Sequence, residues 1–109
     1  MKLVILIVQD YDAPELVREI VKSGLRVTQV ASTGGFLRSG NTTLLAGVED
    51  HQVTRLLRQV DRSSSTRTEV IRPSGIADFD EWYPPEKIEV EVGGATVFIL
   101  DVDRFIRIP

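Results

Sequence analysis

KLVILIVQDYDAPE, residues 2–15, carries a strand signal and a helix signal back to back. Residues 2–9 are a continuous run rich in branched apolar side chains, which is typical of a strand buried inside a sheet. Asp12, Pro14 and Glu15 then match a helix start, with an N-cap, a proline in the first turn and a capping-box glutamate. The sequence therefore predicts a strand that leads directly into a helix.

The next segments repeat these signals. The first helix is expected to end at Gly24 in a left-handed cap, and its apolar positions are Leu16, Val17, Ile20 and Val21. Residues 25–33 and 41–49 alternate or are β-branched, which predicts two further strands. Asp50 is interpreted as the cap of a second helix over 51–61, whose apolar face contains Val53, Leu56, Leu57 and Val60.

The C-terminal third breaks this pattern and then returns to strands. Residues 62–85 show no sustained period and are interpreted as a long loop, although residues 69–72 can pair briefly as a strand. Residues 88–92 and 95–102 are predicted strands, and Gly93–Gly94 is interpreted as a two-residue hairpin turn between them. The order is β-α-β-β-α-β with an extra C-terminal hairpin strand, which predicts an α+β ferredoxin-like sandwich over residues 1–109 as a single domain.

This arrangement leaves one face of the sheet without a helix. Both expected helices cover the same side, and the sequence offers no third helix for the other. Exposed apolar sheet faces are association sites, so another subunit is the expected cover.

Composition limits the classes of function. The chain has 109 residues, a net charge of −3 and no cysteine, which argues against a disulfide framework, a cysteine metal site and broad nucleic-acid binding. The N-terminal apolar run, residues 3–8, is too short for a signal sequence or a membrane span, so we expect a cytoplasmic protein without membrane insertion.

Titratable residues give little sign of catalysis or metal binding. His51 is the single histidine and is interpreted as a first-turn surface residue. Asp10 and Asp12 could suggest Mg²⁺, but a strand end explains Asp10 and a helix cap explains Asp12, so we expect no metal site. No nucleophile and acid–base constellation is recognisable, so we expect neither an enzyme nor a cofactor.

The segment STGGFLRSGNTT, residues 32–43, has the chemistry of a ligand loop. Its adjacent glycines allow backbone N–H groups to approach an anion, and Phe36 can stack on a flat ring. Arg38 offers a planar charged fork to phosphate, and Asn41 both donates and accepts hydrogen bonds. A hairpin loop that uses Phe36 as a packing anchor is the alternative, and local chemistry leaves both open.

Three longer stretches carry a resemblance to a known family. IVQD at 7–10, the ungapped segment at 25–50 that includes GGFLRSGNTT, and VEVGGATVFILDVDRF at 90–105 resemble the bacterial PII-like cyclic di-AMP receptors. The resemblance spans essentially the whole chain and is weakest across 62–85. It implies a homotrimer that binds one cyclic di-AMP in each of three clefts between subunits, and a signalling role through an unknown protein partner.

The resemblance also implies a set of ligand-binding positions. Arg26 and Thr28 would make polar contacts to base or phosphate, and Asn41 would orient the loop and touch the ligand. The full implied set is Arg26, Val27, Thr28, Gly35, Phe36, Leu37, Asn41, Gly47 and Phe98.

Three positions depart from the family pattern. Gly24 stands where relatives often carry asparagine, Val27 replaces a smaller alanine, and Arg107 stands where glutamine is common near the adenine. Each removes or alters a contact and leaves ligand preference open. The alternative function is a PII-type sensor of ATP, ADP or another adenine nucleotide, although the 34–41 connection is short for that class.

Overall fold

The structure is a computed structural model that describes residues 1–30, 40–71 and 88–109. Its first half contains β1 (Lys2–Gln9), α1 (Ala13–Lys22), β2 (Val27–Val30) and β3 (Asn41–Val48). Its second half contains a short 3-10 helix, η1 (Asp50–Gln52), then α2 (Val53–Ser64), β4 (Arg67–Ile71), β5 (Ile88–Val92) and β6 (Ala95–Asp101).

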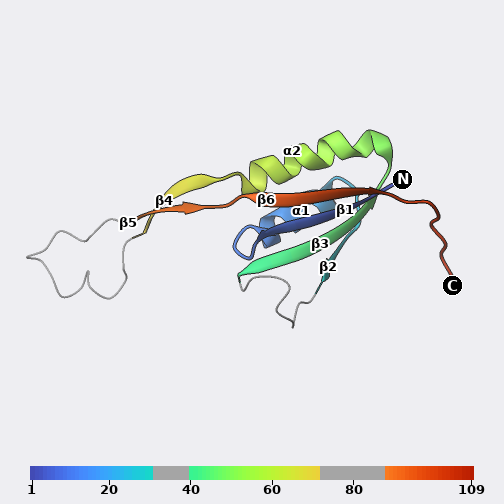
Figure 1. The fold of residues 1–109 in the computed structure, drawn as a ribbon, viewed down its shortest axis with the longest axis horizontal. Coiled ribbons are helices and arrows are strands. Elements are labelled where there is room, and N and C mark those ends of the chain that lie inside the picture. The colour runs from blue at the N-terminus through green and yellow to red at the C-terminus, as the bar shows by residue number, and fades with distance from the viewer. Residues whose placement is uncertain (31–39, 72–87) are drawn as a thin grey trace, which may run out of the picture.

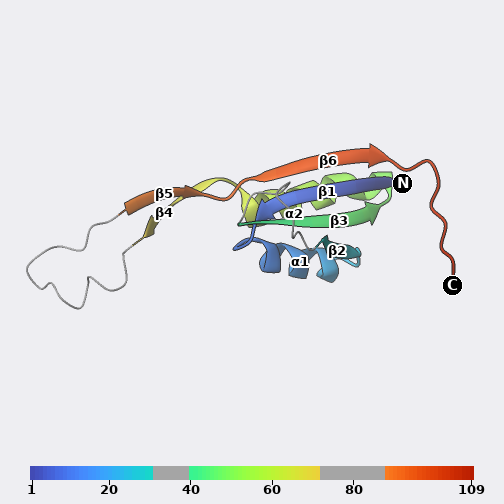
Figure 2. The same ribbon diagram turned by 60° about the horizontal axis from the view of Figure 1, so that its bottom comes forward.

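Four strands form an antiparallel sheet in the order β2-β3-β1-β6. Strand β1 is central, and it pairs with β3 on one side and β6 on the other, as its apolar sequence requires (Figures 1 and 2). The α+β class is therefore confirmed, and an antiparallel sheet with two helices is consistent with a ferredoxin-like fold.

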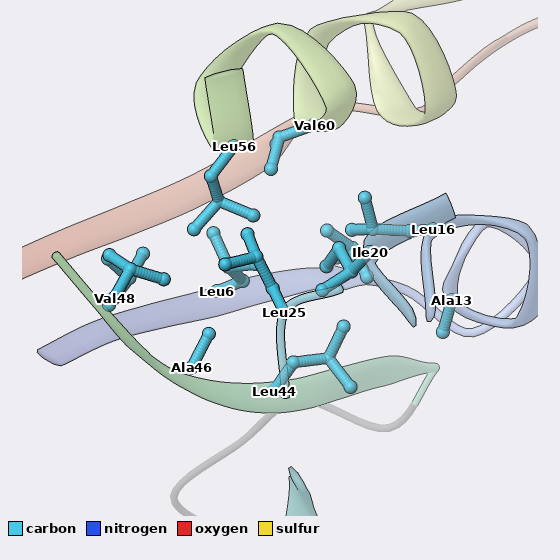
Figure 3. Close-up of a cluster of buried hydrophobic side chains, with 12 residues drawn as sticks. Leu6, Ala13, Leu16, Ile20, Leu25, Leu44, Ala46, Val48, Leu56 and Val60 are labelled. Carbon is cyan, nitrogen blue, oxygen red and sulfur yellow. The ribbon is translucent and has the colours of Figure 1, made fainter. Parts of the chain in front are cut away.

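The hydrophobic core lies between the two helices and one face of this sheet (Figure 3). Alternate residues of β1 and β3 point into it, including Leu6 and Leu44, which are fully buried. Helix α1 contributes Leu16 and Ile20, and α2 contributes Leu56 and Val60. The helix-like spacing of these residues explains why both helices settle on the same side. Leu57 and Val21 were expected on the apolar faces but remain exposed.

Strands β4 and β5 pair only with each other and form a separate two-stranded sheet, called the arm below. The arm projects from one end of the four-stranded sheet, opposite the end where the C-terminus leaves (Figure 1). The predicted hairpin between 88–92 and 95–102 is therefore wrong, because β5 pairs with β4 while β6 pairs with β1. Gly93–Gly94 connects the two sheets instead, and both glycines have positive φ.

The predicted cap at Asp12 is confirmed in position but lacks its hydrogen bond, and the predicted cap at Asp50 is wrong. Asp12 occupies the N-cap of α1, but its side chain makes no capping hydrogen bond. Its carboxylate instead binds Arg67 at 2.8 Å, a residue 55 positions away that no local pattern includes. At the second helix the capping box is formed by Glu49 and Gln52 around η1, rather than by Asp50. Gly24 does adopt the expected left-handed conformation after α1, with φ of +84°.

Several boundaries differ from the sequence prediction. Helix α2 extends to Ser64, and β4 follows at Arg67, so residues 62–64 and 67–71 of the predicted long loop belong to a helix and a strand. The paired stretch expected at 69–72 corresponds to β4. Strand β2 covers only residues 27–30 of the predicted strand 25–33, because residues 25–26 precede the strand and residues 31–33 lie outside the described residues.

Candidate ligand-binding site

The face of the four-stranded sheet that the helices do not cover is called the open face here. Residues paired across antiparallel strands share a face, so the registers of β1, β2, β3 and β6 assign its positions. From β1 and β6 these are Leu3, Ile5, Ile7, Gln9, Thr96, Phe98 and Leu100, and from β2 and β3 they are Thr28, Val30, Asn41, Thr43, Leu45 and Gly47. None of these side chains is charged, so the open face is better suited to contact a flat, largely apolar ligand surface than a bare phosphate group.

Thr28 and Phe98 lie on one continuous row across the sheet. The register pairs Thr28 with Leu45, Leu45 with Ile5, and Ile5 with Phe98. Three strand spacings separate the ends of this row, or about 14 Å. Phe98 is 52% exposed, and Thr28 is exposed as well. Two predicted ligand residues from opposite edges of the sheet therefore frame a partly apolar floor.

Gly47 and Arg26 lie at one end of this floor. Gly47 is exposed, and a Cβ added to it would meet nothing within 4 Å, so the backbone there is open to a ligand. Arg26 directly precedes Val27, and Gly47 directly follows Ala46, the partner of Val27 in the register. Both residues therefore lie at the same end of the β2–β3 ladder, and Arg26 is exposed there.

Asn41 lies at the other end of β3, about 20 Å from Gly47 along an extended strand. It is paired with Gln9 and lines a recess of about 340 Å³ with Gly93, Gly94 and Thr96. The described residues of a single chain therefore do not bring Asn41 and Gly47 into one pocket.

The remaining predicted residues divide into two cases. The side chain of Val27 points to the helix side and packs against the core, which leaves its backbone for any contact with a ligand. Gly35, Phe36 and Leu37 lie outside the described residues. Among the three departures from the family pattern, Gly24 is exposed at the end of α1, and Arg107 is exposed in the segment after β6.

Sequence reasoning missed the connections made by the turn after β1. Gln9 accepts a hydrogen bond from the backbone N–H of Gly93 at 2.8 Å. Asp10 accepts one from the hydroxyl of Thr42 at 2.6 Å. These partners lie 84 and 32 residues away in sequence, and no periodic signal could have identified them.

The ion pairs described next lie away from the open face. Lys2 donates a hydrogen bond to Asp101 across β1 and β6, which raises the pKa of Lys2 and lowers that of Asp101. By the register, both residues lie on the helix side of the sheet, at the start of β1 and the end of β6. The hydrogen bond to Asp12 raises the pKa of Arg67 above its ordinary value. Neither pair contributes a charged side chain to the open face.

A second recess lies on the helix side of the molecule. It has a volume of about 590 Å³ and is lined from α1, α2 and the start of β4 by residues that include Tyr11, Gln59 and Arg67. None of the predicted ligand residues that the structure describes lines it. Its size does not make it the better candidate, because its mixed acidic and basic lining is partly satisfied by pairs such as Arg67 with Asp12.

Among the described residues, no helix is long and apolar enough to cross a membrane.

Comparison with known proteins places the chain in a family. A model of the family described as "Cyclic-di-AMP receptor" matches residues 1–108. A similar solved structure is the crystal structure of a functionally unknown protein from Pediococcus pentosaceus ATCC 25745. It is 42% identical, with a TM-score of 0.78, and the match covers 98% of this chain and 96% of that one. The chain belongs to the cyclic-di-AMP receptor family.

Proposed function

We propose that this member of the cyclic-di-AMP receptor family is a non-catalytic receptor that binds cyclic di-AMP on the open face, in clefts between the subunits of a homotrimer. The observation that carries the proposal is the uncharged open face, on which Thr28 and Phe98 share one register row. A cyclic dinucleotide has two flat bases joined by a phosphate ring, and such a floor accepts the bases.

Each predicted contact residue has a role in this proposal. Phe98 supplies an exposed aromatic surface for one base, and Thr28 supplies a hydroxyl at the opposite end of the row. Arg26 supplies charge for phosphate at the end where Gly47 leaves the backbone accessible. Gly35, Phe36 and Leu37 would add backbone N–H groups and a second apolar wall.

The trimer is proposed because one chain leaves the site incomplete. Asn41 and Gly47 lie too far apart along β3 to close one pocket around a dinucleotide from a single chain. Leu100 and Phe98 are 45% and 52% exposed on the open face, and a neighbouring subunit would cover part of this apolar surface. A cleft between subunits would complete the pocket and would cover the exposed apolar side chains.

The family is one of receptors, which supports a function without catalysis. Binding without a cofactor, a cytoplasmic location and an unknown downstream protein partner complete the proposal. The ligand is the messenger itself, and the output is a change in the shape or contacts of the receptor.

Isothermal titration of the purified chain with cyclic di-AMP, ATP, ADP and cyclic di-GMP tests the function. We expect micromolar or tighter binding of cyclic di-AMP, equivalent to at least about 8 kcal/mol per site. At 100 times Kd, the ligand should stabilise each site by roughly 2.7 kcal/mol, which appears as a higher melting temperature. Binding of ATP or ADP with no heat from cyclic di-AMP would move the protein to the PII-type alternative.

Light scattering on the same sample tests the assembly. The proposal expects the mass of a trimer at micromolar concentration. A monomeric mass in the presence of saturating cyclic di-AMP would contradict a site shared between subunits.

A further inference from the structure

The turn that follows β1 contacts two parts of the molecule that are distant in sequence. On one side it holds the start of β3: the backbone N–H of Asp10 donates to the carbonyl of Gly40 at 2.8 Å, and its carboxylate accepts from Thr42 at 2.6 Å. Residues 40–42 belong to the C-terminal part of the segment 32–43 that contains Phe36. The turn therefore fixes the point where that segment rejoins the sheet.

On its other side the same turn holds both strands of the arm. Asp12 binds Arg67, the first residue of β4, at 2.8 Å. Gln9 accepts the N–H of Gly93, which directly follows β5, at 2.8 Å. A two-stranded sheet has little stability of its own, so these attachments at the base set the arm's position.

The base of the arm is packed against the end of α2 as well as against the turn. Gly93 and Gly94 have φ of +91° and +95°, a region that other residues rarely adopt. A Cβ on Gly93 would collide with the carbonyl of Ser65 and lie 2.8 Å from Arg67 Nη1. The N–H of Gly94 also donates to the carbonyl of Ser64 at the end of α2. The turn and the end of α2 therefore hold the base of the arm together.

The ligand side reaches this base through the recess at the end of the open face. Asn41, a predicted ligand residue, and Gln9 are register partners, and both line this recess with Gly93 and Gly94. A ligand group that displaces Asn41 would thus come next to Gln9, which accepts the hydrogen bond from the N–H of Gly93 at the base of the arm. Gln9 therefore connects the register position of Asn41 with the N–H group at the base of the arm.

Asp12 has an unused hydrogen-bonding position in the turn. Its side chain is 3% exposed, and its Oδ2 has no hydrogen-bond partner among the described residues. It occupies the N-cap of α1 without bonding the helix N–H groups, which carboxylates favour. The carboxylate thus holds Arg67 through Oδ1, and its Oδ2 is available to accept from a helix N–H.

We infer that residues 9–12 couple occupancy of the open face to the position of the β4–β5 arm, with Gln9 on the ligand side and the Asp12–Arg67 pair on the arm side. This inference rests on the proposed binding of cyclic di-AMP and names the output of that site. The arm is the part that changes, and the turn is the element that transmits the change.

Hydrogen exchange of the full chain, with and without saturating cyclic di-AMP, tests the inference. Asp12→Asn and Arg67→Gln each remove the arm–body ion pair from one side and leave the open face unaltered. Glu69→Gln is the matched control, because it removes the other partner of Arg67, at 3.2 Å within β4, and keeps the bond to Asp12. Titration calorimetry on each variant measures binding separately.

We expect cyclic di-AMP to slow exchange of the amides in 67–71 and 88–92 by about fivefold or more in the unmodified protein and in Glu69→Gln. Asp12→Asn and Arg67→Gln should retain Kd within about twofold and lose this slowing. If one variant fails to fold, the other tests the same bond.

Three outcomes overturn the inference. Tight binding with no exchange change in the arm would remove the coupling and leave the receptor function intact. Slowing that persists in both ion-pair variants would show that the coupling takes another route. An absence of cyclic di-AMP binding in calorimetry would refute the proposed function, and the inference with it.

Discussion

The two faces of the four-stranded sheet carry side chains from the same strands, yet the protein covers only one of them. On the helix side, Leu6 and Leu44 are fully buried beneath α1 and α2. On the open side, their neighbours Ile5 and Leu45 are half-buried, and Phe98 is half exposed. An antiparallel sheet that faces water normally alternates apolar with polar residues. The apolar part of the open face is the surface that the proposed neighbouring subunit or ligand would cover.

The largest expected effect is a loss of fold stability, and it should occur at only one of two adjacent residues of β3 that face opposite sides of the sheet. Leu44→Ala should lower the free energy of unfolding by about 2–5 kcal/mol, because it opens a cavity in the core. Leu45→Ala should leave the fold intact and weaken assembly, because its side chain faces the proposed subunit contact. Chemical denaturation and light scattering measure the two effects. Equal losses of stability, with the mass unchanged for both variants, would contradict the assignment of faces.

A second variant addresses the link between sheet and arm. Gly93→Ala should destabilise the arm's base by about 1–3 kcal/mol, because it forces a side chain into a positive φ and against the carbonyl of Ser65. Limited proteolysis should cut the arm faster while the core keeps its melting temperature. Gly24→Ala is the control, since Gly24 also has positive φ but a Cβ there would meet no atom within 4 Å. Equal cleavage of the arm in both variants would argue against the close packing at Gly93.

A third variant tests the glycine segment. Phe36→Ala should weaken cyclic di-AMP binding about tenfold or more, because base–aromatic stacking is worth roughly 1–3 kcal/mol. Calorimetry measures the affinity, and thermal melting measures the fold. Unchanged affinity beside a collapsed melting temperature would make Phe36 a packing residue.

The smallest expected effect is the pH response of the exposed Lys2–Asp101 pair. The pKa of Asp101 is lowered in the folded state, so its contribution is present above its ordinary value of 3.8 and is lost as pH falls through the folded value. The pKa of Lys2 is raised, so its contribution is complete below 10.5 and is lost as pH rises through the folded value. Thermal melting of Asp101→Asn should therefore differ slightly from the unmodified protein near neutral pH, and the difference should disappear as pH falls through the folded pKa of Asp101. A difference that grows in acid would contradict this assignment.

Local patterns predicted most of the secondary structure, because strand alternation and helix spacing are properties of neighbouring residues. These patterns failed where the structure depends on a contact between residues that are far apart in the sequence. The Gly93–Gly94 signal is the same whether it joins a hairpin or two separate sheets, and only the pairing of β5 with β4 distinguishes them. The carboxylate of Asp12 was interpreted as a cap because Arg67 is 55 residues away.

The candidate site shows the same limit of sequence-based prediction for individual residues. Thr28 and Val27 are neighbours in sequence, and the resemblance implied both as ligand contacts. The register turns Thr28 to the open face and Val27 to the core, so the side chain of only one can reach a ligand there. The shared row of Thr28 and Phe98 likewise depends on strand pairing, which sequence periodicity does not specify.

The most direct test of the open face as the ligand site compares two adjacent residues of β6. Phe98 and Ile99 are 52% and 45% exposed and lie on opposite faces of the sheet, so Phe98→Ala and Ile99→Ala are matched truncations. In calorimetric titration with cyclic di-AMP, Phe98→Ala should raise Kd about tenfold or more. Ile99→Ala should leave Kd within about twofold. Equal effects of the two changes, or a larger effect from Ile99→Ala, would contradict binding on the open face.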